Sequence, residues 1–327
     1  MVRERLTLGV KILISVSLLL YLIHRVGGVH QVLLQIQGIR RSFLLWAFLL
    51  YMGAVLLGSV KWFVLLQAQG VQVPYRALVK YTLIGAFFNN VLPANVGGDV
   101  VRGYGLAHHT ARSEAAVSVV IDRLVGLFAF LTAAAVAGSV LLLAASRGWT
   151  HLSPQGWENV RVLTALAWAA VGGMGGMLGI LLSRRSKRWL EEVLQRMGPA
   201  RPLLPVFHRV AQALNAYRHA YRALVGAVCI SWGVLVLTSL ENWILAYALQ
   251  PGRVPFLYVL LFNPLIAFAL LIPLSVGGVG IGQSAYVFFY SLVNVPERLA
   301  FTLSLVHQLL VYASSLPGAL LWLTRRS

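Results

Sequence analysis

Four charged residues lie within apolar stretches of this chain, where an ion is costly unless it has a partner or a function. Asp99 and Arg102 are three residues apart, so they share one face of a helix. Asp122 and Arg123 lie about 10 Å into an apolar run that begins near residue 115. Guanidinium groups bind phosphate through paired N–H donors. These residue types predict a buried site for a phosphate-bearing group.

Each of these residues also has a structural interpretation. Asp99 could accept hydrogen bonds from free backbone N–H groups at a helix start, and Arg102 could pair with it. Adjacent helix positions do not face each other, so Asp122 and Arg123 each need a separate partner. We expect Arg123 to reach a cavity and Asp122 to support it. A purely structural ion-pair network is the alternative.

A motif of proline and paired glycines occurs twice. The strings are VLPANVGGD at residues 91–99 and LIPLSVGGVG at residues 271–280, so the proline and both glycines recur at an offset of 180. Proline removes a backbone donor and glycine loosens the backbone, so each motif predicts a broken helix. Backbone N–H groups freed at such breaks can bind a phosphate. The candidate residues at the two breaks are Asn90, Asn95, Gly97, Gly98, Gly277, Gly278, Gly280 and Gln283.

A second polar pair, Glu241 and Asn242, lies inside the apolar run at 223–249. Subtracting 180 from these positions gives Lys61 and Trp62, which places a base and an acid at equivalent points of the two halves. We expect Lys61 to extend its ammonium group toward the nearby membrane surface. Glu241 has no such surface nearby, and with Asn242 it is a candidate for substrate binding.

No metal, cofactor or nucleotide site is expected. His108 and His109 are not accompanied by another histidine or cysteine at ligand spacing. The chain contains no P-loop, no G-x-S-x-G and no H-E-x-x-H pattern. We therefore expect no ATP hydrolysis.

The composition is that of an integral membrane protein. Hydrophobic residues make up 59% and charged residues 11% of the chain, and the mean hydropathy is +0.78, whereas soluble domains carry about 25% charged residues. The net charge of +18 gathers in short loops beside apolar runs. The positive-inside rule and anionic lipid explain that distribution better than nucleic acid does. The N-terminal run lacks a cleavage site and is expected to remain as the first span.

Six apolar runs are long enough to cross a bilayer as helices. They lie near residues 6–24, 43–66, 115–145, 162–182, 223–249 and 299–323. Two further segments, 75–114 and 255–294, are apolar but are interrupted by the glycine motifs. Each interrupted segment could be a full span with a surface piece, or a re-entrant hairpin.

Charge and crossing parity favour hairpins. The connection 183–222 holds nine Lys and Arg residues against two in 147–161, which places it in the cytoplasm. The basic N-terminus and the basic tail are placed inside by the same rule, and counting crossings then makes each interrupted segment start and finish on one side. The halves at about 43–145 and 223–323 thus form an inverted-topology repeat, in which a substrate site forms near the midplane. The alternative is that the proline and glycines of each motif form an ordinary kink in a transmembrane helix.

Three strings, in order, resemble the lysylphosphatidylglycerol synthase transmembrane family, also described as flippase-like membrane proteins. They are NNVLPANVGGDVVRGYGL, VVIDRLVGL and IPLSVGGVGIGQSAY, and the resemblance covers nearly the whole chain. It implies a protein of the cytoplasmic membrane that moves a polar-headed lipid between leaflets. Family members commonly carry glutamate after the second glycine motif, where this chain has Gln283. That difference argues against proton coupling at this position.

The leading hypothesis is a lipid translocase whose substrate is a membrane lipid, with anionic lipids held at the basic cytoplasmic connection. A lipid-headgroup transferase is the enzymatic alternative, but such chemistry on an aminoacyl donor needs a substantial soluble domain. A non-transporting membrane partner of a lipid-biosynthesis enzyme is the third hypothesis. A homo-oligomer is compatible with all three.

Overall fold

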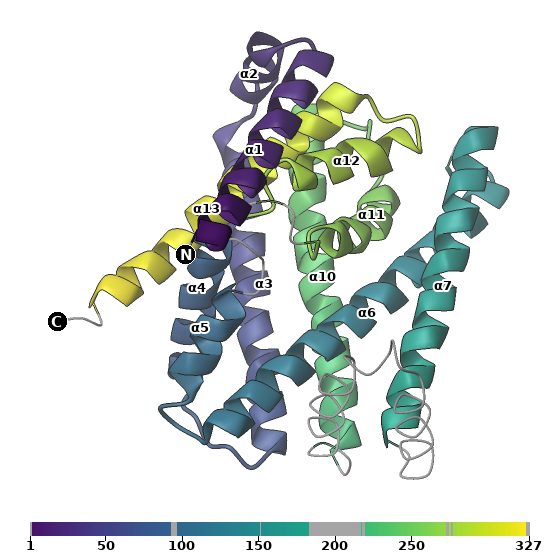
Figure 1. Ribbon diagram of the computed structural model, residues 1–327. Coiled ribbons are helices and arrows are strands. Elements are labelled where there is room, and N and C mark those ends of the chain that lie inside the picture. The colour runs from purple at the N-terminus through teal and green to yellow at the C-terminus, as the bar shows by residue number, and fades with distance from the viewer. Residues whose placement is uncertain are drawn as a thin grey trace.

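The computed structural model describes residues 2–92, 97–150, 152–182, 217, 220–272, 275 and 277–324. Within these residues the chain is all-helical and contains no strand (Figure 1). The helices are α1 (Val2–Arg25), α2 (Val29–Gln37), α3 (Arg41–Ala68), α4 (Tyr75–Val91), α5 (Gly97–Leu106), α6 (Arg112–Ser146), α7 (Pro154–Leu182), α10 (Tyr221–Leu249), α11 (Phe256–Ala269), α12 (Ile281–Ser291) and α13 (Glu297–Leu323).

Five helices are long and apolar enough to cross a membrane: α3, α6, α7, α10 and α13. They coincide with five of the six predicted spans. The first predicted span is different, because α1 is followed by α2 at a bend of 78°. Residues 25–42, expected to be a loop, therefore contain a helix. Gly27 and Gly28, both with positive φ, make the sharp turn between α1 and α2.

Both interrupted segments are pairs of helices that pack on each other. In the first pair, Tyr81 and Gly85 of α4 approach Gly105 and Gly98 of α5, respectively, so the two helices run antiparallel. In the second pair, α11 and α12 are in contact, and the ring of Phe262 stacks on that of Phe289. Each predicted segment is thus two helices: α4 ends at Val91 and α5 begins at Gly97, while α11 ends at Ala269 and α12 begins at Ile281.

The helix contacts cross between the two halves of the chain. The long helices α3 and α10 begin at residues 41 and 221, which differ by 180, and they pack against each other. α13 of the second half packs on α4 of the first, and α6 of the first half packs on α11 of the second. A two-fold repeat would produce this reciprocal pattern. The inverted repeat and the re-entrant path of the hairpins through a bilayer stay predictions.

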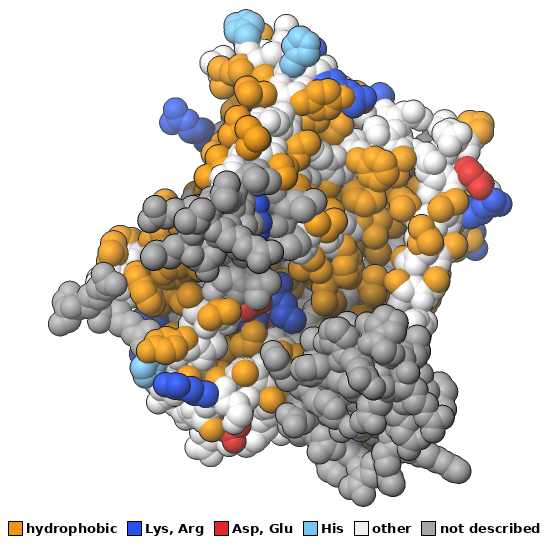
Figure 2. Space-filling model, viewed as in Figure 1, with side chains coloured by type: hydrophobic (Ala, Val, Ile, Leu, Met, Phe, Trp, Pro, Cys, Tyr) orange, Lys and Arg blue, Asp and Glu red, His pale blue; other side chains and the backbone are white. Residues whose placement is uncertain are grey.

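The outside of the molecule is apolar, as contact with lipid requires. On the face shown in Figure 2, hydrophobic side chains gather over the C-terminal part of α1 and over α11. Leu20 and Leu166, for example, are 62% and 61% exposed. A large surface of exposed apolar side chains is stable when it contacts lipid or another apolar partner.

The glycines of the first hairpin permit its close packing. The Gly98 N–H donates a hydrogen bond of 2.8 Å to Oδ1 of Asn89. A Cβ atom placed on Gly98 would lie 1.9 Å from the carbonyl oxygen of Gly85. No side chain fits between the two backbones at this point.

Gly98→Ala is therefore expected to destabilise the fold by about 1–3 kcal/mol, the usual cost of overpacking a closely packed contact. The unfolding temperature in detergent would measure the change. Gly173→Ala is the matched control, because a Cβ on Gly173 in α7 meets nothing within 4 Å. Equal unfolding temperatures for the two variants would contradict the close approach of α4 and α5.

Candidate functional site

Five charged side chains from three helices form a continuous row, which we call the ion-pair ladder. Lys61 Nζ of α3 lies 2.9 Å from Asp122 Oδ1 of α6. Arg102 of α5 joins the two acids, with Nη2 2.7 Å from Asp122 Oδ2 and Nε 2.9 Å from Asp99 Oδ1. Arg123 of α6 completes the ladder through its Nε, which pairs with Asp99. The adjacent residues 122 and 123 thus have separate partners.

The ladder contains one more cation than anions. Three cationic and two anionic side chains give it a net charge of +1. Four members have side chains only 6–13% exposed, whereas the Arg123 side chain is 39% exposed. The excess positive charge is therefore most accessible at Arg123. A buried cluster with an unbalanced cation is suited to hold an anion.

An aromatic platform holds Arg102 in place. Its guanidinium carbon lies 4.9 Å from the ring centroid of Trp62, a favourable cation–π distance. The Trp62 Nε1–H donates to Ser118 Oγ at 3.2 Å, and the Ser118 hydroxyl donates to the carbonyl of Ala115. This chain of contacts ties α3 and α6 together around the buried centre of the ladder.

Two cavities, each of about 270 Å³, lie beside the ladder. The first contains all five ladder residues and is closed partly by apolar side chains of α3, α6 and α10. The second is lined by residues of both hairpins, including Asn90, Gly277 and Gln283. Arg123 and Asn89 line both cavities. Arg123 therefore lies where the two cavities adjoin.

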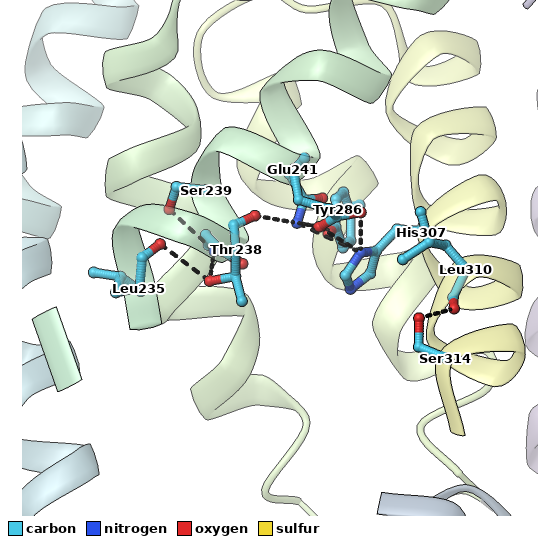
Figure 3. A network of polar contacts seen from close by, with 10 residues as sticks. Leu235, Thr238, Ser239, Glu241, Tyr286, His307, Leu310 and Ser314 are labelled. Carbon is cyan, nitrogen blue, oxygen red and sulfur yellow. Dashed lines mark hydrogen bonds and ion pairs between the residues drawn. The ribbon is translucent and has the colours of Figure 1, made fainter. Parts of the chain in front are cut away.

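A second polar cluster, shown in Figure 3, surrounds Glu241 of α10. Nδ1 of His307, on α13, lies 3.1 Å from both carboxylate oxygens. Asn242 donates to Glu241 Oε2 at 2.9 Å, and the Tyr286 hydroxyl donates to Asn242 Oδ1. Glu241 is 0% exposed. His307 and Tyr286 line the second cavity, so the buried acid is connected to that cavity through them.

The two hairpins touch at their breaks. A Cβ placed on Gly277 would lie 2.7 Å from the carbonyl oxygen of Asn90 at the end of α4. Gly277 and Gly278 both have positive φ, at 58° and 76°, a conformation that glycine adopts without strain. The two glycine motifs therefore lie next to each other in the described part of each break.

The predicted phosphate cradle at the second break needs a correction. The Gly280 N–H donates to Gln283 Oε1 at 2.6 Å, so it is already bonded. Gln283 is 1% exposed and caps α12. Gly277 and Gln283 line the second cavity. The backbone N–H of Gly280 is not available to bind a phosphate there.

Several other predicted positions differ in detail. The expectation that Lys61 reaches the surface is wrong, because it pairs with buried Asp122. Asp99 is more than a helix cap, since two arginines bind its carboxylate. Gly97 packs under Leu92, whereas Gly98 lines the first cavity. Glu241 and Asn242 are 0% and 1% exposed, and their contact with a substrate stays a prediction.

Two predictions lie outside the described residues. Asn95 belongs to the first break, and most of the basic connection at 183–222 also falls outside the described part of the chain. His307, by contrast, was missed by the sequence reasoning. It is an ionisable residue in the middle of an apolar run, and that alone is a signal of a functional site.

The fold and the site define a class of protein: an all-helical, multi-pass membrane protein with a buried ionic centre. The chain belongs to the lysylphosphatidylglycerol synthase TM region family, whose model matches residues 9–318. This membership suggests a function related to membrane lipids. Comparisons with curated proteins and with solved structures gave no match.

Proposed function

We propose that this protein is a translocase that moves a lipid with an anionic, phosphate-bearing headgroup between the leaflets of a membrane. The observation that carries the proposal is the position of Arg123, the most exposed member of a ladder with a net charge of +1, between two cavities. A phosphate there would be bound by a guanidinium group already oriented by Asp99. The acyl or prenyl chains would remain in the surrounding lipid.

The arrangement of the hairpins supports alternating access. Each hairpin contributes residues to the second cavity, and the two meet where Gly277 approaches Asn90. In inverted-repeat transporters a substrate bound at the interface of the halves is exposed to one side and then the other as the halves rock. The same movement here would carry a headgroup past Arg123. No covalent step is required.

The proposal includes an orientation in the cytoplasmic membrane. The abundance of Lys and Arg in 183–222 supports a cytoplasmic position for that connection and for both termini. Anionic lipids would be attracted to the same connection.

Arg123→Ala tests the proposal. The variant removes the excess cation and leaves the ladder with two cations and two anions, so selective movement of an anionic lipid should slow by at least about tenfold. The assay uses fluorescently labelled phosphatidylglycerol and phosphatidylcholine in proteoliposomes, with a membrane-impermeant quencher to follow the label that reaches the outer leaflet. Arg161→Ala is the matched control, since Arg161 is 65% exposed and pairs with Glu158 on the surface.

Both variants are compared with the wild type by size-exclusion profile before reconstitution. Unchanged, headgroup-selective movement by folded Arg123→Ala protein would contradict the role given to Arg123. A wild-type protein that moves neither lipid faster than empty vesicles would refute translocation of phosphatidylglycerol.

A further inference from the structure

Glu241 is a carboxyl group without a permanent cation beside it. Its side chain is fully buried in the middle of α10, and among the described residues its only ion-pair partner is His307. A buried carboxylate surrounded by neutral groups is unstable and takes up a proton instead. Asp99 and Asp122 have arginine and lysine partners, whereas the ion-pair partner of Glu241 is a histidine, which is a cation only when protonated.

The groups that face the Glu241–His307 pair come from several helices. α3 contributes Tyr51, whose ring lies edge-on to that of His307 at 6.2 Å between centroids. α12 contributes Tyr286 and Tyr290, which stack on each other at 5.9 Å. α6 contributes Arg123, which shares the second cavity with His307.

The neighbouring α11 and α4 contribute amides to this region. Asn263 of α11 donates to Thr238 Oγ1 and Ser239 Oγ, while Asn89 and Asn90 of α4 line the cavity. These groups do not change charge in the physiological range. Among the described neighbours, His307 is thus the group that contacts the Glu241 carboxylate and can carry a proton.

We infer that Glu241 and His307 together form a proton-binding site whose occupancy is coupled to the binding of an anionic lipid headgroup. The geometry is that of a shared proton: Nδ1 of His307 is equidistant from Oε1 and Oε2 of Glu241, at 3.1 Å (Figure 3). With one proton the pair is neutral overall, and with two it carries one positive charge.

The second proton would act on the same cavity as the headgroup. His307 lines this cavity together with Arg123, whereas Glu241 lies behind it. Within the described structure the Nε2 atom of His307 makes no hydrogen bond, so this atom is available to exchange a proton with cavity water. A positive pair facing Arg123 raises the attraction for an anion. By reciprocity, a bound anion raises the attraction for the proton.

This inference rests on the proposed function for its ligand, but its test does not require transport. Short-chain phosphatidylglycerol is titrated into the detergent-solubilised full-length protein by calorimetry near pH 6.5, in buffers that differ in ionisation enthalpy. The dependence of the measured heat on the buffer gives the number of protons taken up per bound lipid. We expect an uptake of up to about one proton for the wild type.

Two variants test the residues separately. Glu241→Gln keeps the shape of the side chain and removes the proton site, and His307→Asn keeps a donor near the position of Nδ1 but cannot take up a proton. Proton uptake should fall to near zero in either variant that folds. Glu158→Gln is the control, because Glu158 is 47% exposed and pairs with Arg161; its uptake should equal that of the wild type.

Equal proton counts for the wild type and both variants, including zero in all three, would overturn the inference. Failure of the proposed function has a different signature. In that event labelled lipid stays in its leaflet even though the calorimetric difference between wild type and Glu241→Gln persists. If lipid moves but the proton counts are equal, the translocase proposal stands and the proton site does not.

Discussion

Replacing Asp122 with alanine is expected to destabilise the protein by about 3–5 kcal/mol, the cost of breaking a buried ion pair from one side. Asp122 is the acid between Lys61 and Arg102, and its side chain is only 6% exposed. The substitution leaves Lys61 buried without a carboxylate and takes one of two acids from Arg102. We expect a large fall in unfolding temperature in detergent, and loss of folded protein at growth temperature.

The loss of stability should be reversed in part when Lys61, which has lost its carboxylate partner, is replaced as well. In Lys61→Met/Asp122→Ala both charges are replaced by apolar side chains, while Arg102 keeps Asp99 at 2.9 Å. Replacing a whole buried pair is often neutral for stability, so the double variant should be more stable than Asp122→Ala. The double-mutant cycle isolates this coupling. A single variant as stable as the wild type would show that Asp122 is not buried between its cations.

Asp99→Asn is expected to raise the affinity for an anionic headgroup by at least about tenfold. Asp99 is the acid that pairs with Arg123. Its neutralisation changes the net charge of the ladder from +1 to +2. Arg102 still retains Asp122, so the core of the ladder remains paired. The guanidinium of Arg123 loses the carboxylate of Asp99 as a partner, which leaves more of its positive charge for the headgroup.

Binding of short-chain phosphatidylglycerol to the detergent-solubilised protein measures this effect, with phosphatidylcholine as the zwitterionic comparison. The control is Glu158→Gln, which removes one negative charge from an exposed surface pair. Asp99→Asn and Arg123→Ala should change the affinity in opposite directions. A fall in affinity for both would mean that the geometry of the Asp99–Arg123 pair, rather than its net charge, determines binding.

The helices could be located from the sequence because apolarity and length are local properties. The predicted spans 223–249 and 299–323 each begin two residues inside the observed helices α10 and α13. The bend between α1 and α2 was missed, although Gly27 and Gly28 mark it in the sequence. Beyond the bend α2 packs on α13, whereas α1 packs on α12. The breaks were predicted correctly, because proline and paired glycines act on the backbone wherever they occur.

The site was accessible to prediction only where its contacts are local. The Asp99–Arg102 pair follows from a spacing of three residues on one helix. The contacts of Asp122 with Lys61 and of Glu241 with His307 join residues more than 60 positions apart. No pattern along the chain specifies which residue of α6 or α13 will face α3 or α10. The cost of leaving an ion unpaired indicated that partners exist, but not which ones.

The unbalanced charge of the ladder has an electrical consequence for the proposed cycle. A singly charged lipid headgroup bound at Arg123 would cancel the charge of the ladder, as long as the Glu241–His307 pair takes up no second proton. Membrane voltage would then exert little force on the loaded protein, whereas the empty protein would feel up to about 2.3 kcal/mol per 100 mV for its one uncompensated charge. In that case the resting potential would act on the return of the empty protein and not on the step that carries the lipid. With one proton taken up per lipid, the loaded and the empty protein would carry the same charge, and the potential would act on both steps.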